Sequence, residues 1–250
     1  MERLIETGTA SSPVNENRMT GACCELFAGP SMLGLPASLL ECFDRISEPI
    51  GVGDLDRRLK QPKAPRIICI ADGYLEPGFA IQNDEIKRAL SAGWPVWGIG
   101  SVGALKAVEL AAEGMQGFGL VYRMLRRLRA VSADDVAVLH YPFPPYEPET
   151  LALLEIYMLL RVARKTKSSL TDIDVRSVLE ALQEKPLHDR TYEVVRECIP
   201  KYLWKYLDYV YDTPKEWRIK RQDLWSFCQR KPWLIQNIEP NNSIHGRAND

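Results

Sequence analysis

Residues 95–110 read PVWGIGSVGALKAVEL, and this stretch decides the fold. Its first five residues are apolar or small and predict a short buried strand that ends at Gly100. From Ser101 onward, apolar residues recur at helical spacing, which predicts a helix that stops before Gly114. The N–H groups at the start of such a helix are free and carry partial positive charge. The turn is therefore a candidate site for an anion or an oxyanion.

The same succession of strand and helix is found on both sides of this stretch. Apolar runs predict further strands at residues 24–28, 66–71 and 135–140. Helical spacing predicts helices between them at residues 35–46 and 81–92. Runs that are apolar on both faces are typical of strands inside a parallel sheet. The alternation predicts an α/β fold with a mostly parallel sheet flanked by helices.

The pattern changes to helices alone after Pro148. Helical spacing is found at residues 149–165, 171–184 and 188–211, with no strand-like run among them. An all-helical C-terminal part is predicted, which either packs on the sheet or forms its own lobe. The expected segments are a disordered tail at 1–20, an α/β core at 21–147, a helical C-terminal part at 148–235 and a flexible tail at 236–250.

Composition restricts the class of function. The chain has 250 residues, with 32 Lys and Arg against 33 Asp and Glu, and this balance gives no overall attraction to nucleic acid or to an anionic membrane. Its 6 cysteines and 3 histidines form no local metal-binding motif, so neither a metal nor another cofactor is expected. No apolar run approaches the roughly 18 residues of a membrane helix. The polar N-terminus does not resemble a signal peptide, and a cytoplasmic location is expected.

Three interpretations of the glycine turn remain open. Gly98, Gly100 and Gly103 match the G-x-G-x-x-G pattern of dinucleotide-binding folds, but no acidic residue stands where the ribose partner is expected. In the second interpretation, Ser101 is a nucleophile held at a strand-to-helix turn and activated by a base. In the third, Ser101 only caps the helix and the glycines serve close packing.

Several side chains are candidates to assist Ser101. Lys106 follows five residues later, which places it on another side of the helix. Asp72 and Gly73 end one predicted strand, and His140 ends another. Since the carboxyl ends of parallel strands share one edge of a sheet, these residues are expected to lie near Ser101.

Basic side chains gather in three short segments, at residues 123–129, 161–167 and 215–221. A solvated face is the ordinary role of such a segment, and Lys220 is interpreted in this way. Where such a face binds a partner, the balanced total charge of the chain favours an acidic protein over nucleic acid.

The stretch around Ser101 resembles a known family. Residues 98–110, GIGSVGALKAVEL, are similar to the motif G-A-S-S-M-G-A-L-R-A-A-E-L of TfuA-like proteins. The resemblance covers about residues 24–141. Further matching segments are AGPS at 28–31, GDL at 53–55, DGY at 72–74, GMQGFG at 114–119 and DDVAVLH at 134–140.

The resemblance implies an accessory protein of peptide backbone thioamidation. Such proteins work with a YcaO enzyme, and sulfur arrives as the thiocarboxylate of a ThiS-like carrier protein. The family member is thought to bind both and to hydrolyse the thiocarboxylate with a Ser–Lys pair. The substrate peptide is a further candidate partner, whereas no membrane or nucleic acid is implied. The alternative is a non-catalytic adaptor that recruits or activates the YcaO enzyme and its peptide.

The family motif also points to individual residues. Ser101 matches a motif serine and Lys106 matches the motif arginine. The family's H-K-E-I-L segment aligns with NDEIK at residues 83–87, so Asp84 stands at the position of the paired lysine, and Lys87 or Lys106 would have to replace it. This departure favours the adaptor. The hypothetical site has Ser101 and Lys106 as catalytic residues and Asp72, Gly73, Glu85, Gly98, Gly100, Gly103 and His140 as supporting or binding residues.

Overall fold

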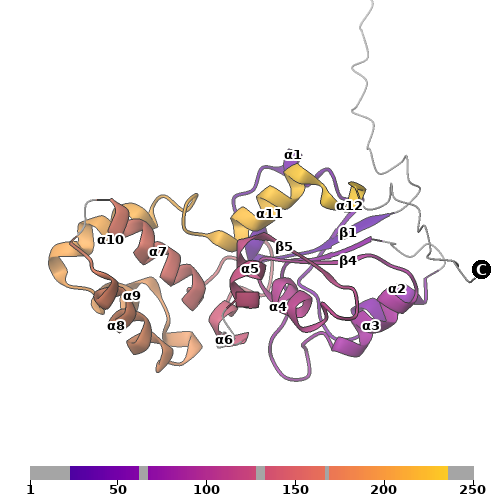
Figure 1. Cartoon of the computed structure of the whole chain (residues 1–250), viewed down its shortest axis with the longest axis horizontal. Coiled ribbons are helices and arrows are strands. Elements are labelled where there is room, and N and C mark those ends of the chain that lie inside the picture. Colours follow the sequence, from indigo (N-terminus) through magenta and orange to yellow (C-terminus); the bar gives the residue numbers. More distant parts are fainter. Residues whose placement is uncertain (1–22, 62–66, 128–132, 167–168, 236–250) are drawn as a thin grey trace, which may run out of the picture.

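The computed structural model describes residues 23–61, 67–127, 133–166 and 169–235. Figure 1 shows an α/β core that carries the labelled strands and, at the left, a lobe made of helices. The two expected tails, residues 1–20 and 236–250, lie outside the described residues.

The core is built on a sheet of five strands in the order β2-β1-β3-β4-β5, and every pair is parallel. The predicted fold class, a parallel sheet flanked by helices and followed by a helical region, is thus confirmed. The central strands are buried on both faces, as their apolar runs predict. The strands are β1 (Cys24–Phe27), β2 (Arg45–Ser47), β3 (Ile67–Ile70), β4 (Val96–Ile99) and β5 (Gln116–Phe118).

Alternate side chains of β3 enter different cores, because successive residues of a strand point to opposite faces. Ile68 and Ile70 pack against α2 (Asp54–Leu59), α3 (Asn83–Ser91) and α4 (Val102–Glu109). Ile67 and Cys69 join the opposite core with α11 (Ile219–Arg230) and α12 (Pro232–Ile235). The short helix α1 (Ala37–Leu40) lies on this second face, where its Leu39 and Leu40 contact the core.

The prediction of a strand at residues 135–140 is wrong. The segment begins in α6 (Ala133–Val136) and continues as chain that an isolated bridge joins, at His140, to Pro148. The sheet edge next to β4 is occupied instead by β5, which is half-buried and has only three residues. With glycine at its centre, β5 has no apolar run by which periodicity could identify it.

The helix expected at residues 35–46 is also shorter than predicted. Only Ala37–Leu40 is helical, and the end of the segment forms the edge strand β2. β2 is mostly exposed, so it lacks the apolar pattern of an inner strand. The helices expected after β3 and β4 are present as α3 and α4.

Four helices of the C-terminal region form the lobe around a core of their own. They are α7 (Leu153–Lys165), α8 (Asp172–Gln183), α9 (Tyr192–Glu197) and α10 (Trp204–Tyr211), and their shared core includes the buried Trp217. The single helix expected at 188–211 is interrupted near Pro200, which precedes a 3-10 turn (Lys201–Leu203). A capping box at Thr171 and Asp174 starts α8. The helical part thus contains a lobe, α7 to α10, and two helices, α11 and α12, that return to the sheet.

The lobe and the core meet in a small apolar cluster. Val121 and Leu125 of α5 (Gly119–Arg127) contact Leu154 of α7 and Ile219 of α11 there. A buried arginine adds a polar link: Arg190, 1% exposed, binds the carboxylate and carbonyl of Asp134 and the carbonyl of Lys185. The start of the lobe is therefore fixed to the part of the core that follows α5.

The helices of the described residues differ from membrane-spanning helices. In residues 23–61, 67–127, 133–166 and 169–235, none combines the length and apolar character that crossing a bilayer demands.

Candidate functional site

A cavity of about 610 Å³ opens at the carboxyl ends of the central strands. Four predicted site residues line it: Asp72 and Gly73 after β3, Ser101 after β4, and His140 beyond α6. The strand order changes direction between β1 and β3, and open α/β sheets bind ligands at such a point. The parallel strands bring Asp72, Gly73 and Ser101 to one edge, and His140 reaches the same cavity from a segment that is not a strand.

The glycines of the β4–α4 turn are required for packing. A Cβ atom on Gly98 would overlap the carbonyl of Gly103, and one on Gly103 would overlap the carbonyl of Ile70. Gly100 has a φ of +67°, a conformation that favours glycine. The strand and helix can approach each other this closely only because these side chains are absent.

The N–H groups of the same turn are mostly occupied. Those of Ser101 and Gly103 both donate to the carbonyl of Ala71, at 3.3 and 3.2 Å. A dinucleotide phosphate would need these donors, so the geometry does not favour the dinucleotide interpretation. The N–H of Val102 has no acceptor in the described part of the chain. The N–H of Val102 is therefore a candidate donor to a developing oxyanion.

Ser101 does not cap α4 through its side chain. It is the N-cap residue by position, but its hydroxyl makes no capping hydrogen bond. Its Oγ instead donates a long hydrogen bond, 3.4 Å, to the carbonyl oxygen of Val136. The residue is only 6% exposed, yet it lines the cavity wall. The hydroxyl is consequently available for other chemistry.

A lysine that the sequence did not single out as catalytic lies beside Ser101. Lys220, in the first turn of α11, is 3% exposed and donates from Nζ to the same Val136 oxygen at 3.0 Å. The backbone of Lys220 also packs against Gly100. Val136 ends α6, so its carbonyl has no helical partner and accepts both donors. The interpretation of Lys220 as part of a solvated face is therefore wrong.

The structure places Lys106 away from this pair. Its Nζ donates to Asn83 at 2.8 Å and to Glu109 at 3.0 Å, and it does not line the cavity. Glu85 is likewise engaged elsewhere, because its Oε1 accepts the N–H of Gly53 between α2 and α3. Asp84, at the position expected for the family lysine, is exposed on α3. These residues lie on α3 or make their contacts next to it, and they do not contact the hydroxyl of Ser101.

Asp72 lines the cavity and joins the segments that follow β1 and β3. Its carboxylate accepts the N–H groups of Gly29 and Ser31, at 2.8 and 2.9 Å, and the Ser31 hydroxyl at 2.7 Å. With these three donors the carboxylate is a brace between the ends of β1 and β3. It is thus more suited to fixing the cavity than to transferring protons.

His140 is half-buried in the cavity wall. Its Nδ1 lies 2.7 Å from the carbonyl of Tyr141, which fixes the proton on Nδ1, and its ring meets Tyr146 edge-on. It makes no hydrogen bond to Ser101 in the described structure. Its Nε2 is left as an acceptor for a ligand in the cavity.

Comparison with known proteins identifies the family of the central segment. Residues 72–191 match the family model described as TfuA-like protein, which confirms the family recognised in the sequence. No curated protein matches the chain. The matched segment includes Asp72, Ser101 and His140 but ends before Lys220.

Proposed function

Residues 72–191 are TfuA-like, and from this premise we propose that the protein is an accessory factor of peptide backbone thioamidation that works with a YcaO enzyme in the cytoplasm. Its finer role would be to receive sulfur as the thiocarboxylate of a ThiS-like carrier protein. The cavity above Ser101 would bind the thiocarboxylate and hydrolyse it to hydrosulfide for the YcaO enzyme. The substrate peptide is a further candidate partner.

One observation carries the catalytic part of this proposal. Ser101 Oγ and Lys220 Nζ donate to a single oxygen, that of Val136, beside a cavity large enough for a ligand. Hydrolysis of a thiocarboxylate is acyl transfer, which needs a nucleophile, a proton acceptor and a donor to the oxyanion. Ser101, Lys220 and the N–H of Val102 supply these three functions.

The steps balance with these residues alone and one water. The neutral amine of Lys220 accepts the Ser101 proton as the serine oxygen attacks the thiocarboxyl carbon. The carbon–sulfur bond breaks, and the proton passes from Lys220 to the sulfur, which leaves as hydrosulfide. Water, giving a proton to the same amine, then attacks the acyl-serine. The amine passes this proton to the departing Ser101 oxygen, and the released carboxylic acid ionises to a carboxylate and one proton.

Gly73 in the cavity lining suits a substrate that approaches through its backbone. Packing requires glycine there, because a Cβ would lie 2.8 Å from Ile50, and the residue therefore adds no side chain to the cavity. Absence of side chains lets a peptide backbone approach closely. An extended, glycine-rich carrier tail would meet this requirement.

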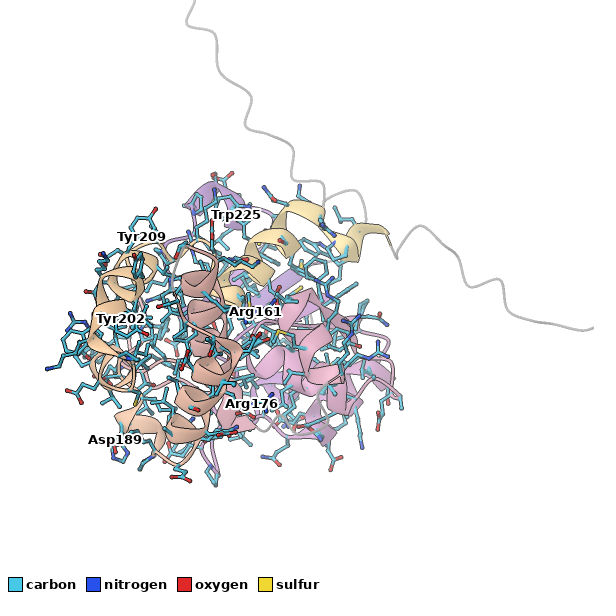
Figure 2. The ribbon with its side chains drawn as sticks, turned by 60° about the vertical axis from the view of Figure 1, so that its left-hand side comes forward. Arg161, Arg176, Asp189, Tyr202, Tyr209 and Trp225 are labelled. Atoms are coloured by element: carbon cyan, nitrogen blue, oxygen red, sulfur yellow. The ribbon has the colours of Figure 1, made fainter. Side chains whose placement is uncertain are left out.

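A specific observation favours the adaptor as the second candidate. The expected lysine position holds the exposed Asp84, and the helical lobe presents two large exposed side chains, Tyr202 and Tyr209, 65% and 64% exposed. Figure 2 shows both on the side of the lobe away from the α/β core. Tyrosine is frequent in protein interfaces.

The first prediction separates the two functions. We expect the wild-type protein to convert a purified ThiS-like thiocarboxylate to its carboxylate, followed by intact mass. Ser101→Ala and Lys220→Met should each lower the rate by at least about 1000-fold, since they remove the nucleophile and its base.

The matched control is Lys106→Met. It makes the same replacement at a lysine of α4, the helix that follows Ser101, whose amine is bound to Asn83 and Glu109. It should retain nearly full activity. Equal losses in the two lysine variants would contradict the assignment of Lys220. No hydrolysis by the wild type, with YcaO binding retained, would leave the adaptor as the function.

A further inference from the structure

A second, smaller cavity lies behind the wall of the first. It has a volume of about 20 Å³, and Pro30 and Val138 line both cavities. Its polar lining comes mainly from four charged side chains, Glu155, Arg218, Lys220 and Arg221. The volume suffices for about one water molecule, which needs two to four polar partners.

Glu155 faces this small cavity as a buried carboxylate. It lies in the first turn of α7 and is 7% exposed. It makes no hydrogen bond or ion pair with any residue in the described ranges. An ionised carboxylate without a partner is costly to bury. The side chain therefore requires a polar partner that enters through the cavity.

Basic side chains line the same space. The Nε atoms of Arg218 and Arg221 are buried and have no acceptor within the described residues. Nζ of Lys220 has more than one N–H donor, of which Val136 accepts one. A carboxylate without a donor and an amine with donor capacity to spare thus both line a volume of one water.

We infer that a single water molecule occupies the small cavity and joins the Glu155 carboxylate to the Lys220 amine, which makes Glu155 a positioning residue for Lys220. The positioning role rests on the proposed function, in which Lys220 is catalytic. The contact between Glu155 and Lys220 does not depend on it. When Lys220 accepts the Ser101 proton, its new positive charge is stabilised by the carboxylate across the water. The positive charges of Arg218 and Arg221, which line the same cavity, destabilise a positive charge on Lys220, and the negative charge of Glu155 offsets this effect.

The contact is tested by a double-mutant cycle in the full chain. We expect Glu155→Gln to lower the melting temperature in the wild type, because the water-mediated hydrogen bond from Lys220 loses its charged acceptor. In the Lys220→Met background the same change should raise the melting temperature, because it removes a buried charge that no longer has a partner. Effects of residues in contact are non-additive in this way, whereas independent residues give additive shifts.

Glu149→Gln is the matched control, since Glu149 is an exposed carboxylate just before the same helix. It should give the same small shift in both backgrounds. An equal shift for Glu155→Gln in both backgrounds would overturn the contact with Lys220, whatever the outcome of the hydrolysis assay.

The positioning role has a kinetic readout of its own. Glu155→Gln should lower kcat for hydrosulfide release by about tenfold or more with KM unchanged, as loss of a supporting partner typically does. Glu155→Asp should recover part of the loss, because the charge is restored. If the melting-temperature shifts of Glu155→Gln and Lys220→Met are non-additive but Glu155→Gln leaves kcat unchanged, the contact stands and the positioning role is overturned.

Discussion

The side chain of Asp223 alone joins two parts of the chain that are about 100 residues apart in sequence. It lies on α11 and accepts the N–H groups of Leu120 and Val121, at 2.6 and 2.8 Å, at the start of α5. Gly119, with a φ of +102°, lies against the carboxylate, where no side chain would fit. Burial raises the pKa of Asp223 to about 6, although the two N–H donors and Arg123 act in the opposite direction.

This raised pKa predicts a pH dependence of stability. The folded protein binds the Asp223 proton more tightly than the unfolded chain, whose pKa is near 3.8, so protonation adds stability as the pH falls from about 6 toward 4. Between pH 7 and pH 5, the free energy of unfolding of the wild type should rise by about 1 kcal/mol relative to Asp223→Asn.

Urea titrations at pH 7, 6 and 5 measure this difference. Asp212→Asn, at an exposed position, is the control and should follow the wild type throughout. Parallel pH profiles for the wild type and Asp223→Asn would contradict the assignment.

Residues of the cavity differ in how far the sequence predicts them. Asp72, Gly73 and Ser101 directly follow strands of a parallel sheet, so strand topology alone brings them to one edge. His140 also reaches the cavity, although its segment is not a strand. Lys220 could not be predicted, because its burial depends on how α11 packs after the lobe. The one local sign in the sequence was that Lys220 directly follows Ile219, an apolar residue that is buried in the structure.

Among the elements, the β4–α4 unit shows the tightest packing. A Cβ on Gly103 would overlap the Ile70 carbonyl of the neighbouring strand. Gly103→Ala should therefore lower the free energy of unfolding by about 3 kcal/mol or more, because the helix must move away from β3. Gly93→Ala is the matched control: its φ is +79°, but open space surrounds its Cβ position. It should cost only about 1 kcal/mol. Similar losses in urea unfolding would contradict the close contact.

Element prediction succeeded where a segment is buried on both faces. The runs at β1, β3 and β4 are continuous, because both faces of the sheet are covered. The edge strands β2 and β5 have three residues each and are partly exposed, so they carry little apolar signal. Their identity is decided by pairing with a neighbour, which a local pattern does not contain.

At the scale of the whole molecule, the lobe stands beside the core and leaves one of its own sides open (Figure 2). Tyr202, in the 3-10 turn before α10, and Tyr209, on α10, both lie there and are largely exposed. If the YcaO enzyme binds this side, Tyr202→Ser combined with Tyr209→Ser should weaken binding at least tenfold in calorimetry.

Phe79→Ser is the control for that measurement, because Phe79 is similarly exposed, at 58%, but belongs to the core. Its affinity for the enzyme should be unchanged, and all variants should melt near the wild-type temperature. A greater loss with Phe79→Ser would move the interface to the core.

The return of α11 to the sheet has a consequence for how the protein is made. The ribosome releases the strands first, and Phe227 and Trp233, which cover one face of the sheet, emerge only after the lobe. Until then, only α1 and its neighbouring residues cover that face, and Lys220 has not yet reached Val136 beside Ser101. We expect the nascent chain to depend on a chaperone over this interval, and the protein to gain activity only after synthesis has passed α12.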